Sequence, residues 1–164
     1  MARATIHLRF NGITETAFLF YKSVFGTDFS APTLHWEDMG EFHCSPLTEE
    51  EKKLVLHIEL PITAGCVLSG SDYPEEQGFT ITTGDNFSIH LECETREEAE
   101  FLFDALSEGG KIELPICRTE RVSHYTGHLV DRFGIHWNFT GPMKSNRRTE
   151  TPNPYKASPR QGQK

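Results

Sequence analysis

The chain has 164 residues, of which 37% are hydrophobic and 11% aromatic, and its formal net charge is −8 at pH 7. This length and apolar content suffice for an ordinary globular core and exclude a wholly disordered chain, while an acidic chain argues against nucleic acid as the main partner. No apolar stretch approaches the roughly 20 residues that a membrane helix requires.

Cellular location and redox state follow from two further observations. Residues 1–10 contain no continuous apolar stretch of the kind found in a secretory signal, so we expect a cytoplasmic protein. The cysteines are far apart and form no C-x-x-C pair, which predicts reduced thiols and no structural zinc site. The four are Cys44, Cys66, Cys93 and Cys117.

The first half of the chain predicts a strand, a helix and three further strands. Residues 5–10 alternate polar and apolar side chains, which is typical of a strand with one buried face. Residues 14–25 predict a helix that ends at Gly26. Residues 54–62 and 66–71 predict a hairpin, and the stretch 25–36 supplies the remaining strand.

The second half predicts the same order of elements. Residues 88–93 predict a strand, and the helix that follows begins at Thr95, where Thr95 and Glu98 match a capping box. This helix ends before Gly109, and residues 111–117, 127–131 and 135–139 predict three strands. Residues 37–51 and 73–85 are long connections, the second of which links the halves.

An internal repeat relates the two halves. A shift of 83 residues places Thr5-Ile6-His7-Leu8 on Ser88-Ile89-His90-Leu91 and, without a gap, Ala17-Phe18-Leu19-Phe20 on Glu100-Phe101-Leu102-Phe103. We therefore predict two βαβββ modules, about 4–73 and 86–140, within one domain of residues 1–142. The pentapeptide Ile58–Ile62 recurs at Ile112–Ile116, but at an offset of 54, and we interpret it as a coincidence of strand composition.

Residues 143–164 differ in charge from the rest of the chain. They carry a net charge of +5, whereas residues 1–142 carry −13. The segment is rich in polar residues and proline and has no apolar period, which predicts a flexible basic tail. A basic anchor is the less favoured interpretation.

The strand pattern also predicts a polar face with four of the eight histidines. If the apolar side of each strand packs on the helices, the opposite side faces away from them. This face would carry Thr5, His7, Arg9, Val55, His57, Glu59, Val67, Ser69, Ser71, Ser88, His90, Glu92, His136 and Asn138. Any half-solvated sheet shows such alternation, but the matched positions of His7 and His90 favour ligand binding.

Several blocks in the same order resemble one protein family. They are Phe10-Asn11-Gly12, residues 17–26, Gly70-Ser71-Asp72, Glu97-Glu98-Ala99, residues 106–110 and residues 131–137. Together they look like the PhnB-like branch of the glyoxalase and bleomycin-resistance, or vicinal oxygen chelate, superfamily. The resemblance covers about residues 4–140. It implies an α+β fold in which the two βαβββ modules form a cup-shaped mixed sheet with helices outside, and it implies a homodimer.

The resemblance also implies where a divalent metal would bind. Superfamily enzymes use one side chain from the opening strand and one from the closing strand of each half, which correspond here to His7 with Ser69 and His90 with Asn138. Two imidazoles suit a metal, but a hydroxyl and an amide supply no anionic ligand. We therefore expect no certain cofactor and at most weak binding of a divalent ion.

Three hypotheses follow. The first is a small-molecule binder, metal-free or weakly metal-bound, in which His7, His57, His90, His136, Asn138 and Ser69 hydrogen-bond the ligand. The second is a metal-dependent lyase, isomerase or dioxygenase, with His7 and His90 as ligands and Glu59 or Glu92 as general base. The third is a structural or partner-binding role. Chains of this branch are often labelled methyltransferases, but no glycine-rich turn for a methyl donor is present.

Overall fold

The computed structural model describes residues 2–40, 46–63, 65–73, 80–118 and 124–142. Cys44 and the predicted basic tail, residues 143–164, lie outside these ranges. The chain divides between Thr82 and Thr83 into two compact units, here called unit 1 and unit 2. Each unit is described by itself. In the described part of the chain, no helix is long and apolar enough to cross a membrane.

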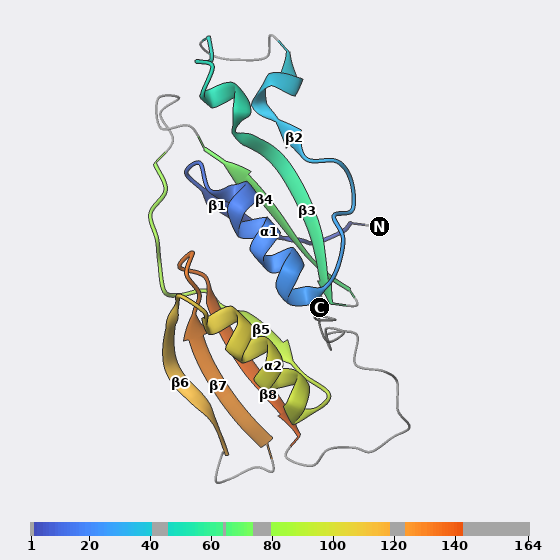
Figure 1. Ribbon diagram of the computed structural model, residues 1–164, viewed down its shortest axis with the longest axis vertical. Coiled ribbons are helices and arrows are strands. Elements are labelled where there is room, and N and C mark those ends of the chain that lie inside the picture. The colour runs from blue at the N-terminus through green and yellow to red at the C-terminus, as the bar shows by residue number, and fades with distance from the viewer. Residues whose placement is uncertain (1, 41–45, 64, 74–79, 119–123, 143–164) are drawn as a thin grey trace, which may run out of the picture. The chain divides into compact units, whose positions relative to one another are not determined.

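Unit 1 is a four-stranded mixed sheet with a helix on one face (Figure 1). Its elements are β1 (Ile6–Phe10), α1 (Thr14–Phe25), β2 (Leu34–His35), 3-10 helices at Trp36–Met39 and Glu51–Lys53, β3 (Val55–Thr63) and β4 (Cys66–Asp72). The strand order is β1-β4-β3-β2, with β1 parallel to β4. The strand expected within residues 25–36 is present, but it is only two residues long.

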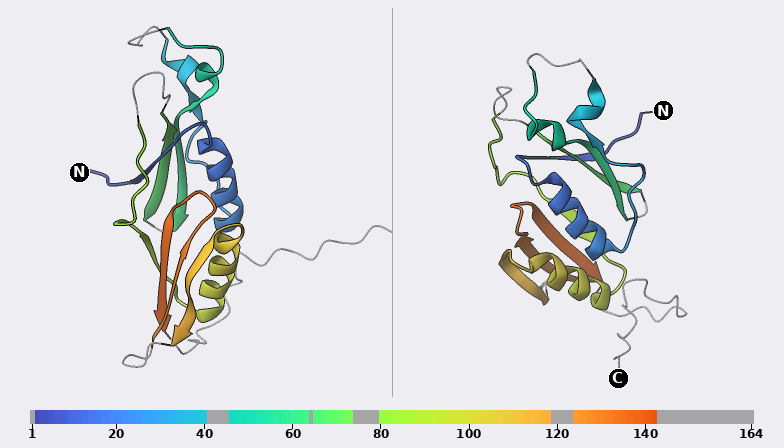
Figure 2. Two further views of the ribbon diagram at one scale, coloured as in Figure 1. Left: turned by 90° about the vertical axis from the view of Figure 1, so that its left-hand side faces the viewer. Right: turned by 45° about the horizontal axis from the view of Figure 1, so that its top comes forward.

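Unit 2 has the same architecture. It contains β5 (Ile89–Glu92), α2 (Arg96–Ser107), β6 (Lys111–Arg118), β7 (His124–Val130) and β8 (His136–Pro142). The strand order is β5-β8-β7-β6, with β5 parallel to β8. Figure 2 shows each helix on one side of its own sheet. The predicted pair of βαβββ modules and the α+β class are therefore confirmed.

The repeated pentapeptide occupies different places in the two sheets. In unit 1 it lies in β3, between β4 and β2, whereas in unit 2 it lies in β6, which is at the sheet edge. The two copies are thus not equivalent by duplication.

Both helices end where the sequence predicts. The φ angle of 64° at Gly26 ends α1 in the left-handed region, which glycine adopts without steric cost. At the start of α2, the Thr95 hydroxyl accepts a hydrogen bond from the Glu98 backbone N–H at 3.1 Å. The Glu98 carboxylate in turn accepts from the Glu94 backbone N–H at 3.0 Å, one residue earlier than in the standard capping box.

The ungapped register of the repeat is wrong by one residue in the helices. Strands β1 and β5 begin 83 residues apart, whereas α1 and α2 begin and end 82 residues apart. The buried positions of the two helices also match at 82, since Ala17 and Tyr21 correspond to Ala99 and Phe103. The connection between strand and helix is therefore one residue shorter in unit 2.

The two units fill the space between helix and sheet in different ways. In unit 1, a Cβ added to Gly70 of β4 would meet the ring of Phe18, which is fully buried. In unit 2, the ring of Phe139 in β8 packs edge-on against Phe103 with centroids 5.3 Å apart. The helix position that corresponds to Phe18 is the exposed Glu100. A large helix residue over glycine in one unit is thus replaced by a large strand residue in the other.

A buried carboxylate connects the elements of unit 1. The Asp72 side chain, at the end of β4, accepts hydrogen bonds from the backbone N–H and hydroxyl of Thr14 at 3.1 and 2.7 Å. It also accepts from the backbone N–H of Val55 at 3.0 Å. Because Thr14 opens α1 and Val55 opens β3, one side chain joins three elements.

Candidate functional site

The polar face of unit 1 lies opposite α1. Along β1, Thr5, His7 and Arg9 are exposed, whereas Leu8 and Phe10 are buried, as the alternation predicts. Val55 is an exception, because it was expected on the polar face and is only 1% exposed. It lies at the start of β3, where the pairing with β2 shifts register, so simple alternation does not predict its burial.

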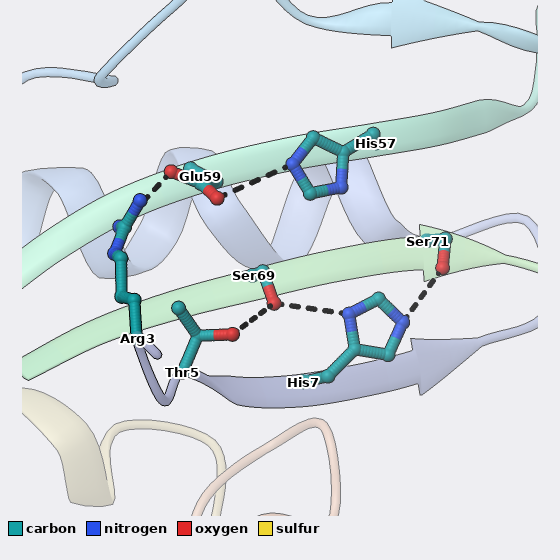
Figure 3. Close-up of polar contacts among 7 residues, drawn as sticks. All are labelled: Arg3, Thr5, His7, His57, Glu59, Ser69 and Ser71. Carbon is teal, nitrogen blue, oxygen red and sulfur yellow. Dashed lines mark hydrogen bonds and ion pairs between the residues drawn. The ribbon is translucent and has the colours of Figure 1, made fainter. Parts of the chain in front are cut away.

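His7 lies between two serine hydroxyls of β4 (Figure 3). Its Nδ1 is 3.0 Å from the Ser69 Oγ and its Nε2 is 2.9 Å from the Ser71 Oγ. The Ser69 Oγ is also 3.4 Å from the Thr5 Oγ1. A neutral imidazole has one donor and one acceptor nitrogen, so one serine donates to the ring and the other accepts from it.

The surroundings of His7 favour this neutral form. Partial burial of the ring lowers its pKa below the ordinary value of 6.5, and the nearby charges of Arg9 and His57 lower the pKa further. Ring and serines therefore form a neutral hydrogen-bonded chain at neutral pH.

The lowered pKa predicts a loss of stability in acid. Because the unfolded chain binds a proton at His7 more readily, the stabilising contribution is complete above about pH 6.5 and declines as the pH falls toward the folded-state value. We expect His7→Gln to reduce the difference in free energy of unfolding between about pH 7.5 and about pH 5, as measured by urea denaturation. His124→Gln, which removes an exposed histidine, should keep the wild-type difference. An unchanged difference in His7→Gln would contradict the assignment.

Glu59 lies beside Ser69 and is occupied by two basic groups (Figure 3). An Arg3 guanidinium nitrogen is 3.1 Å from one carboxylate oxygen, and the His57 Nε2 is 3.4 Å from the other. The register pairs Glu59 with Ser69 and Ser69 with His7, so these residues form a row across β3, β4 and β1. An ion pair with Arg3 makes Glu59 a weak candidate for a general base.

The polar face of unit 2 has a related arrangement. His90 pairs in register with Asn138, as His7 does with Ser69. The His90 Nε2 is 2.8 Å from the Thr140 Oγ1, and the Asn138 side-chain amide donates to the Ser88 Oγ at 2.8 Å. The other two predicted residues also belong here, since Glu92 is exposed at the end of β5 and the His136 Nδ1 is 3.9 Å from a Glu113 carboxylate oxygen.

One residue of this face was missed from the sequence. His128 pairs in register with Asn138 and lies between the buried residues Gly127 and Leu129. The alternation within the predicted strand 127–131 was sufficient to find it. The row across β5, β8 and β7 is therefore His90, Asn138 and His128, the counterpart of His7, Ser69 and Glu59.

The structure thus brings the predicted residues together in two groups. Unit 1 holds His7, His57, Glu59 and Ser69 on one face, and unit 2 holds the face with His90, Glu92, His136 and Asn138. That His7 and His90 point into a common hollow concerns both units at once and stays a prediction.

A family model confirms the relationship that the sequence blocks indicate. The model described as 3-demethylubiquinone-9 3-methyltransferase matches residues 2–140. The chain belongs to this family. The PhnB-like branch of the vicinal oxygen chelate superfamily, predicted from the sequence, is the same relationship. No curated protein matches the chain.

Solved structures agree with this PhnB-like assignment. Protein PA1353 from Pseudomonas aeruginosa is 28% identical, with a TM-score of 0.71 over 87% of this chain and 98% of that one. A putative 3-demethylubiquinone-9 3-methyltransferase, PhnB protein, from Bacillus cereus is 25% identical, with a TM-score of 0.64 over 85% and 99%. A glyoxalase/bleomycin resistance protein/dioxygenase family enzyme from Burkholderia phytofirmans PsJN, 17% identical, has a TM-score of 0.56 over 86% and 99%, which shows the shared fold.

The donor groups of this PhnB-like chain do not fit the metal that the superfamily implies. Both nitrogens of His7 are hydrogen-bonded to serines, and its register partner is a hydroxyl. The register partner of His90 is an amide. Within the described ranges, no three His, Cys, Asp or Glu side chains lie close enough to hold an ion. Neutral donors that are already hydrogen-bonded bind a divalent cation weakly.

Proposed function

We propose that the protein binds a small polar molecule on the polar faces of its sheets and needs no bound metal to do so. The hydrogen bonding of His7 to Ser69 and Ser71 carries this proposal. It gives a neutral row of hydroxyl and imidazole groups, which is suited to hydrogen-bonding a ligand and poorly suited to a divalent cation.

The ligand groups are those predicted from the sequence. In unit 1 they are His7, His57 and Ser69, and in unit 2 they are His90, His136 and Asn138. His128 joins the second group because it flanks Asn138. The metal-dependent lyase, isomerase or dioxygenase, with Glu59 or Glu92 as base, has less support, since the metal donors do not fit and Glu59 is paired with Arg3.

The family's description names a methyltransferase, but we do not extend that activity to this chain. A methyl donor is usually held by a glycine-rich turn between a parallel strand and the next helix. Here the connection from β1 to α1 is Asn11-Gly12-Ile13, which contains a single glycine. A homodimer, expected from the resemblance, is a separate proposal that light scattering of the purified chain would test.

The proposal is tested by ligand screening on metal-free protein. A small-molecule library is screened by thermal shift in the presence of a chelator, and compounds that raise the midpoint are confirmed by calorimetry. We expect binding that persists in chelator and weakens about tenfold or more in His7→Ala. Asp28→Ala, an exposed residue of the same unit, should bind as wild type does.

The opposite results are equally clear. Binding that appears only after a divalent ion is added, together with loss of that ion in His7→Ala, would favour the metal-dependent enzyme. Binding that is unchanged in His7→Ala and Ser69→Ala would remove the polar face of unit 1 from the site.

A further inference from the structure

A second row of polar side chains lies beside the row of His7, Ser69 and Glu59. Arg9 of β1 pairs in register with Ser71 of β4. The pairs Ile58 with Gly70 and Glu59 with Ser69 place His57 of β3 one step further, on the other side of Ser71. Figure 3 shows His57 and Ser71 on the same face as His7. Arg9, Ser71 and His57 therefore cross three adjacent strands, and we call them the Arg9 row.

The guanidinium of Arg9 is held in place without a carboxylate. Its central carbon lies 5.0 Å from the centroid of the Tyr73 ring, a cation–π contact that leaves the N–H groups at its edge free to donate. In the described ranges Arg9 has no ion-pair partner, whereas Arg3 on the same unit is paired with Glu59. The Arg9 row therefore carries an uncompensated positive charge in a chain whose net charge is −8.

Ser71 adds a hydroxyl at the centre of the row. In the imidazole tautomer that is protonated at Nε2, His7 donates to the Ser71 Oγ at 2.9 Å, and the Ser71 hydroxyl proton is then free to donate to a ligand. His57 has a side chain that is 46% exposed and supplies a further ring N–H beside it. The row thus offers three kinds of donor, one of them permanently charged.

The duplicated row in unit 2 has the opposite charge. Glu92 of β5 pairs with Thr140 of β8, and Thr140 pairs with Thr126 of β7. The central hydroxyl is kept at Thr140, but the cation of unit 1 is replaced by a carboxylate. The same backbone geometry therefore attracts an anion in unit 1 and repels one in unit 2.

We propose that the Arg9 row binds an oxyanion group of the ligand, a carboxylate or a phosphate-type group. This inference deepens the proposed function and rests on it. The guanidinium fork of arginine matches the two oxygens of such a group, and charge-assisted hydrogen bonds of this kind are the strongest available at an exposed site. The His7 row then contacts the neutral part of the same molecule.

The test uses simple anions as probes on the full chain. Inorganic phosphate and acetate are titrated separately, with sodium chloride at matched ionic strength, and binding is followed by NMR shifts of labelled backbone amides. We expect at least one of the two to bind in β1 and β4, and the stronger probe identifies the phosphate-type or the carboxylate source. Arg9→Gln should weaken that binding about tenfold, equivalent to about 1.4 kcal/mol, and Arg9→Lys should weaken it less.

The matched control is Glu92→Gln in unit 2. It changes the net charge by one unit, as Arg9→Gln does, but in the opposite direction, and it should not weaken the binding in β1 and β4. Equal affinity in wild type and Arg9→Gln would overturn the proposal, as would a lack of binding by both anions. If these anions fail while an uncharged ligand still binds in a manner sensitive to His7→Ala, this inference is wrong and the proposed function stands.

Discussion

Replacing Asp72 by alanine is expected to lower the free energy of unfolding by about 3–5 kcal/mol. The carboxylate is 2% exposed and accepts three hydrogen bonds, two from Thr14 and one from Val55. Alanine would leave these donors buried without their acceptor, and a hydrogen bond to a charged group contributes about 1.5–3 kcal/mol. The start of α1 and the start of β3 would both lose their connection to β4.

Urea denaturation of Asp72→Ala, compared with wild type, measures this effect. Asp72→Asn separates charge from shape, because it keeps one acceptor oxygen and presents an amide in place of the other; its loss should be intermediate. Asp28→Ala removes an exposed aspartate of the same unit and should leave the urea midpoint unchanged. A wild-type midpoint in Asp72→Ala would show that the buried hydrogen bonds do not anchor β4.

The second large effect is expected from Gly70→Ala in β4. An added Cβ would overlap the ring of Phe18, which is fully buried, and would lie 3.1 Å from the Thr14 methyl group. Overpacking of this kind costs about 1–3 kcal/mol, because neighbouring side chains must leave their preferred rotamers. Since Ser69 and Ser71 flank Gly70, displacement of β4 would also disturb the hydrogen bonds to His7.

Two measurements test this second prediction. The free energy of unfolding should fall by the stated amount, and the ring NMR signals of His7 should shift. Gly84→Ala is the matched control, because an added Cβ there would meet a neighbouring side-chain atom only at 3.5 Å, an ordinary contact distance. Tolerance of both substitutions alike would mean that the Phe18 ring moves freely, contrary to the packing described.

Both predictions concern the strand that carries the proposed site. Asp72 and Gly70 face α1, whereas Ser69 and Ser71 face the polar side of the same strand. Packing on one face therefore sets the positions of the hydroxyls on the other. The ligand-binding proposal for unit 1 depends on this rigidity.

Period-two alternation and the internal repeat were sufficient to predict the two βαβββ units and the register pairs of His7 with Ser69 and His90 with Asn138. These features depend on neighbouring residues along the chain, or on two copies of one unit, so a single sequence contains them. His128 could have been predicted by the same rule.

Other features depend on contacts between residues distant in the chain. The shorter connection before α2 is visible only when the buried faces of the helices are compared, and the burial of Val55 follows from an irregular pairing with β2. The two serines on His7 lie more than 60 residues away from it. Arg3 and Arg9 look alike in the sequence, but only folding pairs Arg3 with Glu59 and stacks Arg9 on Tyr73. Side-chain partners across strands depend on tertiary packing, which local patterns do not contain.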